Sequence, residues 1–445
     1  MSFSSAVLAK HLINLESIAS KPARYIIAFS GGLDSMVLLH ALKNHVFEHK
    51  NKIPIFAVHI NHGLQAESLN WVNKCEKMAT SLGILFKSIN IQINLNSGNG
   101  LEAAARDARY SALDLELGNG DWLITAHHRE DQAETLLLNL IRGSGPTGIA
   151  GISQIRRFGK GWLARPIINI KKNDLVLYAK ENALDWIEDP SNMDQHFDRN
   201  FLRHQILTRL ELRWPNISGR LERSSLLAGE ASQLLSELAE IDFRELGADA
   251  TKIPINKLLN LSIARQRNVI RYALRNEGLS MPSRMQLNQI LNEAVFARKD
   301  AQPLVRWKGV IIRRYRNFLY LMPEKQIIDL KPLIVSNNEL LLGPGMGQLN
   351  FEKSDKIGLS KELFEKGLVV RFRSGGEKIY LYNQSYKRKL KKLLQEKGIV
   401  PWMRNQLPLV YSGENLVAVG DLWLAKDATS CPGIKVRWID RPALH

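Results

Sequence analysis

The sequence predicts an α/β protein: an N-terminal doubly wound, Rossmann-like parallel sheet, then a mainly helical domain and a small α+β C-terminal domain. Three observations support this fold class. In the first half of the chain, short β-branched runs alternate with amphipathic stretches of helix length. The alternation stops near Trp214-Pro215, and from about Leu330 glycines punctuate a third segment that ends in short apolar runs. We therefore expect domains at residues 1–214, 215–329 and 330–445.

The first half contains four predicted strand–helix pairs. The strands are expected at residues 24–29, 53–60, 84–91 and 122–126, and the helices at residues 35–47, 67–82, 101–117 and 130–142. Repeated units of this length imply a parallel sheet that is covered by helices on both faces. Ligands of such sheets bind beyond the carboxyl ends of the strands, so we expect functional residues directly after each strand.

The second and third segments show other patterns. Helical periodicity extends over residues 219–247 and 256–276, and residues 304–321 predict paired strands around Lys308-Gly309. Short strands are expected at residues 407–411 and 416–419. In the run Lys387–Leu394 three leucines recur at helical spacing, which predicts a helix that packs its leucines and exposes its lysines.

Composition excludes several classes of protein. With 445 residues, 45% of them hydrophobic and 24% charged, the chain is typical of globular proteins and too long for one core. No run approaches the roughly 18 apolar residues of a membrane span, and the N-terminus lacks the apolar region of a signal peptide. We expect a cytoplasmic protein without a membrane partner. The two cysteines, Cys75 and Cys431, form neither a disulfide framework nor a CxxC pair.

The net charge of +17 is concentrated in two windows. Residues 265–316 and 371–404 contain the whole basic excess, and the remaining chain is balanced. Such zones indicate a polyanionic partner, most often nucleic acid, although a lysine-rich surface that binds nothing is the alternative. In the first window arginines alternate with aromatic residues, a combination suited to RNA.

The segment Ser30–Ser35 (SGGLDS) follows the first predicted strand and opens the first helix. Two glycines let backbone N–H groups approach a phosphate, and the helix N-terminus adds partial positive charge. The segment lacks the spacing of a GxxxxGK[ST] loop and of GxGxxG. Asp34 would repel phosphate unless a cation intervenes, which predicts a bridging Mg²⁺. The alternative interpretation is a Ser/Asp helix cap.

SGGLDS matches the pyrophosphate-binding motif of the N-type ATP pyrophosphatases, the PP-loop superfamily. Further segments resemble the tRNA(Ile)-lysidine synthetase family, and the likeness spans about residues 24–204 and 371–424. The segments in the first half are His59–Leu64, Glu102 with Arg106 and Arg109-Tyr110, Thr125–Thr135, Arg142–Gly145, and Glu188–Asn192 with Arg199, Asn200 and Arg203. Those in the third segment are Arg373 with Gly375–Glu377, Lys391–Glu396 and Pro401–Arg404.

The resemblance implies a ligase that forms a C–N bond in two steps. ATP adenylates the oxygen on carbon 2 of the wobble cytidine in an isoleucine tRNA with a CAU anticodon, and pyrophosphate leaves. The ε-amine of free L-lysine then displaces AMP, which gives lysidine and changes the codon that is read from AUG to AUA. The implied cofactors are ATP and Mg²⁺, and the implied partners are this tRNA and free lysine.

The resemblance also assigns residues. The expected nucleotide-binding residues are Ser30, Gly31, Gly32, Leu33, Asp34, Ser35, His59 and His62. The expected catalytic residues are Asp34, which is also the metal ligand, Asp131 and Glu134. The expected substrate-binding residues are Arg106, His127, Arg199, Arg203, Lys387, Lys389, Lys391, Lys392 and Arg404.

Several alternatives stay open at this point. Asp131 and Glu134 are also suited to complement a helix dipole, and the sequence does not say which of them binds lysine and which Mg²⁺. Glu102 and Arg106 have the spacing of a surface ion pair. His59 and His62 have no cysteine or acid at the spacing of a zinc site.

Three residues depart from the family pattern: Glu130 stands in place of an aspartate, Gln65 in place of an arginine and Val400 in place of a proline. Two other functions compete with the main one. A PP-loop tRNA thiolase would typically use paired cysteines, and a non-catalytic RNA-binding protein would not need an intact SGGLDS. The oligomeric state is not predicted.

Overall fold

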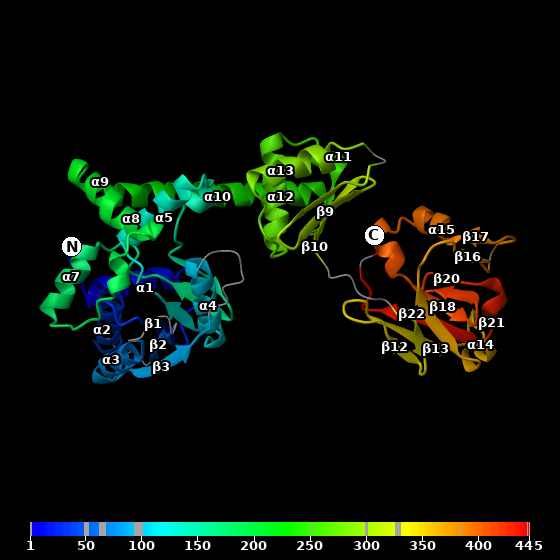
Figure 1. Ribbon diagram of the computed structural model, residues 1–445, viewed down its shortest axis with the longest axis horizontal. Coiled ribbons are helices and arrows are strands. Elements are labelled where there is room, and N and C mark those ends of the chain that lie inside the picture. The colour runs from blue at the N-terminus through cyan, green and yellow to red at the C-terminus, as the bar shows by residue number, and fades with distance from the viewer. Residues whose placement is uncertain are drawn as a thin grey trace. The chain divides into compact units, whose positions relative to one another are not determined.

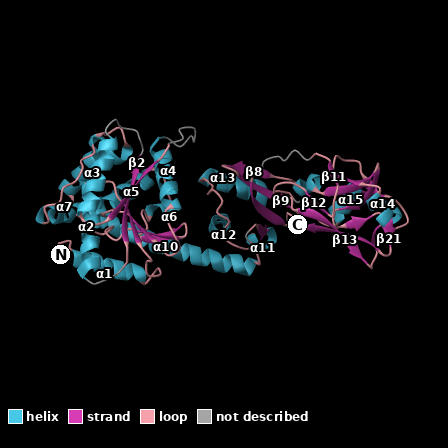
Figure 2. Ribbon diagram, turned by 90° about the horizontal axis from the view of Figure 1, so that it is seen from below, coloured by secondary structure: helices cyan, strands magenta, loops and turns pink. Residues whose placement is uncertain are grey.

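The computed structural model describes residues 2–48, 53–61, 68–92, 101–249, 251–298, 301–324, 331–382, 384–442 and 444. The chain divides into two compact units, Met1–Glu237 and Leu238–His445. Figures 1 and 2 show the elements of each unit. The division into three domains remains a prediction.

The first unit is built on a six-stranded sheet with the order β3-β2-β1-β4-β6-β5. The strands β3, β2, β1, β4 and β6 run parallel, and β5 pairs antiparallel with β6 at the edge. The bounds are β1 Tyr25–Ala28, β2 Ile55–Asn61, β3 Leu85–Asn90, β4 Trp122–Ile124, β5 Ile155–Phe158 and β6 Gly161–Ala164. The four predicted strands are confirmed, whereas the hairpin β5–β6 was not predicted.

Helices cover both faces of this sheet. They are α1 Ser5–Glu16, α2 Leu33–Glu48, α3 Ser68–Ser81, α4 Leu101–Leu115, α5 Arg129–Ile141, α6 Pro146–Ile149 and α7 Lys172–Glu181. Tyr25 and Ile27 pack into one core with α1, α2, α3 and α7, while Ile26 packs into a second core with α4. Successive residues of a strand point to opposite faces, so two cores mean a sheet buried on both sides. The predicted doubly wound architecture is confirmed.

The segment after α7 is helical and leads out of the first unit. It contains η2 Pro190–Met193, α8 Asp198–Phe201, the π-helical turn η3 Leu202–Leu207, α9 Thr208–Arg213 and α10 Ile217–Leu246. Asn200 Nδ2 donates to the carbonyl oxygens of Ser191 and Asp194, which fastens the loop before α8 to the helix.

The second unit begins with helices around an antiparallel sheet of the order β7-β10-β9-β8. Its strands are β7 Lys252–Pro254, β8 Leu304–Trp307, β9 Val310–Tyr315 and β10 Phe318–Pro323, and its helices are α11 Ile255–Leu258, α12 Ile263–Asn276, α13 Arg284–Gln289 and η4 Ile290–Val295. The chain reverses between β8 and β9 at Lys308 and Gly309, which both have positive φ. The predicted strand pair at this turn is confirmed.

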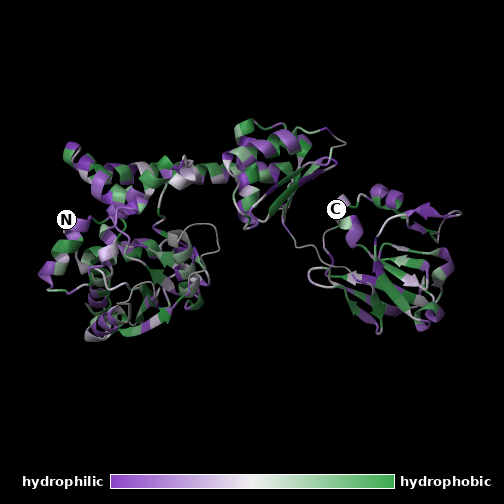
Figure 3. Ribbon diagram, viewed as in Figure 1, coloured by the Kyte–Doolittle hydropathy of each residue, from purple (hydrophilic) through white to green (hydrophobic). Residues whose placement is uncertain are grey.

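The last part of the chain contains two five-stranded antiparallel sheets. One is formed by β11 Leu333–Val335, β15 Leu368–Phe372, β18 Pro408–Ser412, β19 Asn415–Val419 and β20 Trp423–Leu424. The other is formed by β12 Glu339–Leu341, β13 Gln348–Ser354, β22 Gly433–Ile439, β14 Gly358–Leu359 and β21 Thr429–Ser430. Green, hydrophobic residues follow the strands of these sheets in Figure 3. The predicted strands at 407–411 and 416–419 are confirmed as β18 and β19.

Short elements complete this part: α14 Lys361–Glu365, β16 Lys378–Ile379, β17 Arg388–Lys389, α15 Leu390–Glu396, η5 Pro401–Gln406 and η6 Lys426–Ala428. The helix expected within Lys387–Leu394 begins at Leu390, because the two residues before it pair with β16. Its three leucines are buried and its lysines exposed, as predicted. Within the described ranges, no helix is long and apolar enough to span a membrane.

Candidate active site

The SGGLDS segment forms a tight loop between β1 and α2. Gly31 has φ +77°, and a Cβ at this position would lie 2.6 Å from Cys75 Sγ and 2.8 Å from Ile187 Cδ1. Only glycine fits here without a shift of its neighbours. The Ser35 hydroxyl donates to the Gly32 carbonyl oxygen at 2.9 Å. The loop therefore lies at the carboxyl end of β1, as predicted for a phosphate site.

Cys75 lies under this loop as a packing residue. It is fully buried on α3, and burial raises the pKa of its thiol to about 12. The thiol is therefore neutral at physiological pH and poorly suited to attack a substrate. The other cysteine, Cys431, lies in the second unit.

Asp34 lies in the first turn of α2 and is held by a residue that the sequence did not suggest. Lys172 Nζ donates to both carboxylate oxygens of Asp34, at 2.6 and 2.7 Å. Within the described residues, no three His, Cys, Asp or Glu side chains form a metal-binding group. A Mg²⁺ at Asp34 would complete its coordination with phosphate oxygens and water. One carboxylate beside a phosphate loop fits this usual mode of Mg²⁺ binding.

Two histidines follow β4, at the same edge of the sheet. His127 Nδ1 lies 2.8 Å from the Thr125 hydroxyl. Burial is the largest cause that lowers the pKa of His127 to about 3; the positive charges of Arg165, Arg199 and Arg106 add to it, and Asp131 opposes it. His127 is therefore neutral at physiological pH.

His128 has the opposite electrostatics. Burial by itself would lower the pKa of His128, but Asp131, Glu130 and Asp34 together raise it above the ordinary value. His128 Nδ1 lies 3.0 Å from Glu130 Oε2, and Nε2 lies 3.5 Å from Asp131 Oδ2 and 3.7 Å from Asp34 Oδ2. The ring thus connects the phosphate loop with the acids of α5.

Glu130, which departs from the family pattern, has a structural role of its own. Besides contacting His128, its carboxylate accepts a hydrogen bond from the backbone N–H of Lys172 at 3.0 Å. Burial would raise the pKa of Glu130, but the contacts to His128 and Lys172 lower it. Glu130 therefore fixes the start of α7 against α5.

Asp131 and Glu134 lie on one face of α5, where two arginines from the segment after α7 reach them. Glu134 is fully buried; Arg199 Nε donates to it at 2.9 Å and Arg203 Nε at 2.6 Å. Arg203 Nη2 also lies 3.3 Å from Asp131 Oδ1. Both oxygens of Glu134 are thus paired with arginine, whereas the side chain of Asp131 is 14% exposed and more open to a ligand.

The charge of Asp131 gives a testable pH dependence. Burial would raise its pKa, but His128, His127 and Arg199 lower it from 3.8 to about 2. A group whose pKa is lowered by folding stabilises the protein above the unfolded-state pKa, and this contribution disappears as the pH falls through the folded-state value. We expect Asp131→Asn to weaken the loss of stability between about pH 4 and 2. Urea unfolding midpoints across this range measure the effect, and an acid dependence equal to that of the wild type would contradict it.

Other predicted residues of the first unit lie in varied surroundings. His59 is buried in β2, and its Nδ1 donates to the Phe29 carbonyl oxygen at 2.9 Å. Burial lowers the pKa of His59, so it is neutral. Arg106 lies on α4 with its guanidinium 5.2 Å from the Tyr110 ring centroid. His62, Gln65 and the side chain of Glu102 lie outside the described residues.

The remaining predicted residues lie in the second unit. Lys387, Lys389, Lys391 and Lys392 are exposed. Arg404 donates from Nε to the Ile399 carbonyl oxygen and from Nη2 to the Tyr315 hydroxyl. Val400 is buried, and its N–H donates to the Leu444 carbonyl oxygen, a bond that a proline could not make.

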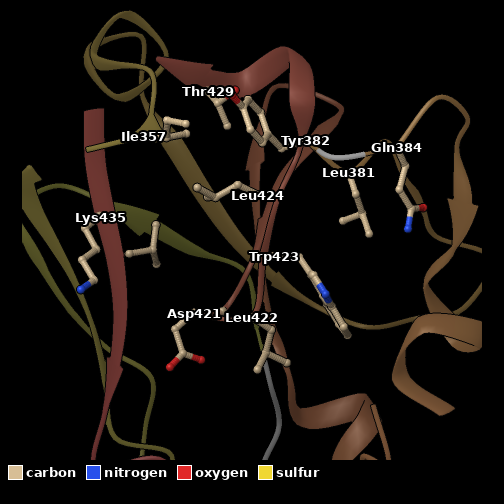
Figure 4. Close-up of a pocket in the computed structure, with 12 residues that line it drawn as sticks. Ile357, Leu381, Tyr382, Gln384, Asp421, Leu422, Trp423, Leu424, Thr429 and Lys435 are labelled. Atoms are coloured by element: carbon tan, nitrogen blue, oxygen red, sulfur yellow. The ribbon is translucent and has the colours of Figure 1, made fainter. Parts of the chain in front are cut away.

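The second unit also contains a cavity of about 500 Å³. Figure 4 shows Tyr382, Trp423 and Lys435 around it. Its lining residues lie between Ile357 and Val436 in the chain, and none was predicted as a site residue. This cavity is therefore separate from the polar network at the phosphate loop.

Three family models match consecutive parts of the chain. A PP-loop domain matches residues 5–210, a TilS substrate binding domain residues 254–320 and a TilS substrate C-terminal domain residues 368–438. The chain is 38% identical over 410 residues to the tRNA(Ile)-lysidine synthase of Coxiella burnetii, covering 92% of this chain and 91% of the relative. It is also 38% identical over 444 residues to the tRNA(Ile)-lysidine synthase of Alkalilimnicola ehrlichii, covering 97% and 96%.

Among solved structures, a U34-tRNA thiolase from Methanococcus maripaludis is 18% identical, with a TM-score of 0.42 over 50% of this chain and 78% of that one. This likeness is too distant to bear on the activity.

Proposed function

The chain belongs to the tRNA(Ile)-lysidine synthase family, and from this premise we propose that it joins free L-lysine to carbon 2 of the wobble cytidine in tRNA(Ile) with a CAU anticodon. The observation that supports this most is the polar network of the first unit. In it, His128 Nε2 lies 3.7 Å from Asp34 Oδ2 of the phosphate loop and 3.5 Å from Asp131 Oδ2 of α5. These short distances support our proposal that the ATP site and a site for a cationic substrate are adjacent.

The first half-reaction uses the loop after β1. Residues Ser30–Ser35 bind the pyrophosphate part of ATP through backbone N–H groups and hydroxyls, at the N-terminus of α2. Asp34 holds Mg²⁺, which when bound offsets the phosphate charge. The cytidine oxygen forms a bond to the α-phosphorus, the bond from that phosphorus to the β-phosphate oxygen breaks, and pyrophosphate leaves with the electron pair.

The second half-reaction uses the acids of α5. We assign the ε-ammonium of lysine to Asp131, because its carboxylate is ionised and partly exposed. His127, being neutral, adds no repulsion of this cation. Glu134 acts through the two arginines that it pairs with, so we assign it a positioning role. The ammonium first loses a proton to solvent. The free amine then forms a bond to carbon 2 while the bond from carbon 2 to the adenylated oxygen breaks, and AMP leaves with that oxygen and its electron pair.

The predicted substrate-binding arginines and lysines are assigned to the tRNA. Arg106, Arg199 and Arg203 surround the histidine and acid positions of the first unit. In the second unit, the exposed Lys387, Lys389, Lys391 and Lys392 are assigned to phosphates. Arg404 is a weaker candidate, because its guanidinium already donates to two oxygens. The protein's location in the cytoplasm remains a prediction.

Neither competing function is favoured by the site. A thiolase would need a reactive thiol near the nucleotide, but the pKa of Cys75 is raised and Cys431 belongs to the other unit. A non-catalytic RNA-binding protein would have no use for a buried network of paired acids and arginines beside a phosphate loop.

The salt dependence of tRNA binding tests the role of the exposed lysines. Replacing Lys387, Lys389, Lys391 and Lys392 by Gln should weaken tRNA binding and reduce the slope of log K against log salt by up to about 3. The reason is that binding with fewer phosphate contacts releases fewer counterions from the tRNA. The matched control replaces four exposed lysines of the first unit: Lys10, Lys21, Lys74 and Lys77. A slope that changes equally in both variants, or in neither, would remove these lysines from the tRNA surface.

Dependence on lysine tests the proposed reaction. With ATP, Mg²⁺ and a CAU-anticodon tRNA(Ile), we expect AMP to be released as a free product only when lysine is present, because lysine displaces it from the adenylated cytidine. The same tRNA with a GAU anticodon is the control and should give no AMP. Release of AMP that requires a sulfur donor and not lysine would contradict the proposal and favour thiolation.

A further inference from the structure

Helix α5 presents two pairs of polar residues on different faces. Asp131 and Glu134 form one pair, three residues apart, and Arg129 and Gln132 form the other. The pairs are offset by two residues, which is about 200° around the axis of an α-helix. Arg129 and Gln132 therefore face away from the two acids of the site. Gln132 is only 5% exposed, so its amide needs partners inside the protein.

The side chain of Gln132 forms four hydrogen bonds. Its Oε1 accepts from the Ile152 N–H at 2.7 Å, and its Nε2 donates to the Ser225 hydroxyl of α10 at 3.0 Å. The other two acceptors are the carbonyl oxygens of Ala150 and Ile152, at 3.2 and 3.3 Å. A Cβ on Gly151 would lie 2.7 Å from Gln132 Oε1, so the turn after α6 closes tightly around the amide. Gln132 thus joins α5, this turn and α10.

Arg129, which precedes Gln132 by one helical turn, makes a second link between α5 and α10. Arg129 Nε lies 2.7 Å from Glu222 Oε2, and the two side chains are only 20% and 13% exposed. Arg129 Nη2 also donates to the Asn169 carbonyl oxygen at 2.6 Å. Ser225, the partner of Gln132, follows Glu222 by one turn of α10 and is 1% exposed. Both links are therefore shielded from water, which competes for such contacts on a surface.

These contacts fix the part of α5 that bears the acid assigned to lysine. Asp131 lies between Arg129 and Gln132 in the sequence, so a shift or rotation of this turn would move its carboxylate as well. A misplacement of about 1 Å can slow a reaction by about 10²-fold, because the reacting atoms lose their alignment. The phosphate loop lies on other elements, between β1 and α2, so adenylation depends less on how α5 is held.

We propose that Gln132 is a positioning residue for lysine transfer, which holds the Asp131 carboxylate in place by fastening α5 to Ser225 of α10. This inference rests on the proposed function, in which Asp131 receives the ε-ammonium of lysine. Gln132 acts through Asp131 and exchanges no proton, because its amide does not ionise and is bonded within the protein. The Ser225 hydroxyl in turn donates to the Ala150 carbonyl oxygen at 2.6 Å, so the link is satisfied on both sides.

Measuring the two half-reactions separately tests this role. Adenylation is followed as single-turnover release of pyrophosphate from ATP with a CAU-anticodon tRNA(Ile) and no lysine. Transfer is followed after lysine is added to the adenylated tRNA on the enzyme. We expect Ser225→Ala, which removes one of the four bonds of Gln132, to slow transfer at least about fivefold and to leave adenylation within about twofold. Gln132→Met, which removes the whole amide at similar length, should slow transfer by about 10²-fold. The lysine concentration at half-maximal rate should rise in both variants.

Ser232→Ala is the matched control. Ser232 follows Ser225 by two helical turns on α10, and its hydroxyl lies 2.7 Å from the Thr147 hydroxyl of α6. The change removes the same group from the same helix but leaves the bond between Ser225 and Gln132 in place. We expect both half-reactions of this variant to stay within about twofold of the wild type.

Transfer at the wild-type rate in either Ser225→Ala or Gln132→Met would overturn the inference. Equal losses in adenylation and transfer would also overturn it, since they would show a general effect on the fold. A loss in Ser232→Ala as large as that in Ser225→Ala would do the same. A failure of the proposed function looks different, because the wild type itself would then transfer no lysine, and this inference would fail with it.

Discussion

Asp34→Ala is expected to reduce the adenylation rate by about 10²–10³-fold, because it removes the carboxylate that we propose to hold Mg²⁺ and that accepts two hydrogen bonds from Lys172. The same change should leave tRNA affinity within about twofold, since the four lysines assigned to phosphates lie in the other unit. In the first unit, Arg199 and Arg203 hydrogen-bond to Glu134, Thr135 and Asp131 and not to Asp34. Stability should change by less than about 1 kcal/mol, because the partner ammonium is partly exposed and can be hydrated. Single-turnover release of labelled pyrophosphate measures the chemical step.

Asp174→Ala is the matched control for this experiment. Asp174 lies in the first turn of α7, as Asp34 lies in the first turn of α2. Any general effect of removing a first-turn acid from a helix dipole should therefore appear in both variants. Unchanged pyrophosphate release in Asp34→Ala would exclude this residue from the site, and equal losses in the two variants would assign its effect to helix stability.

Glu134→Gln is expected to have the largest effect on stability. The side chain is fully buried between Arg199 and Arg203. Removal of its charge leaves Arg199 without this counterion and leaves Arg203 with only the 3.3 Å contact to Asp131. Breaking a buried ion pair in this way costs about 3–5 kcal/mol. The free energy of unfolding from urea titrations, together with the rate of lysine transfer, measures the change. Lysine transfer should fall as well, because Arg203 also contacts Asp131.

Two comparisons make this prediction specific. Glu134→Met combined with Arg203→Met removes one charge of each sign and should destabilise the protein less than Glu134→Gln alone. Glu240→Gln breaks an exposed pair with Arg244 and should cost less than about 0.5 kcal/mol. A stability of Glu134→Gln within about 0.5 kcal/mol of the wild type would show that the buried network does not support the fold.

The long elements of the first unit were predictable because their patterns are local. Strands buried on both faces appear as continuous apolar runs, as in Tyr25–Ala28, and each is followed by an amphipathic helix. The hairpin β5–β6 was missed because its strands have four residues each and Arg156-Arg157 interrupt the apolar pattern. The helix predicted within Lys387–Leu394 began three residues late, because pairing of β17 with β16 overrides helix propensity there.

The candidate site was predictable where it is contiguous in sequence. SGGLDS displays its glycines, hydroxyls and acid within six residues, and the pair Asp131 and Glu134 lies on a single helix. Lys172 was missed because its contact with Asp34 spans 138 residues and depends on how α7 packs against α2. Lys172 could have been predicted from its position after a parallel strand, where site residues are expected, but that strand, β6, had not been recognised in the sequence. Glu130 and Val400 likewise gained their roles only from backbone partners that no local pattern reveals.

Nucleoside analysis of the product tRNA tests the central claim most directly. The full chain would be incubated with ATP, Mg²⁺, radiolabelled lysine and bulk bacterial tRNA, and the labelled tRNA then digested to nucleosides. The account predicts label in one tRNA only, the CAU-anticodon tRNA(Ile), on a single nucleoside derived from the wobble cytidine, and no label with Asp34→Ala. Label on another nucleoside, or none in any tRNA despite normal ATP binding, would contradict it.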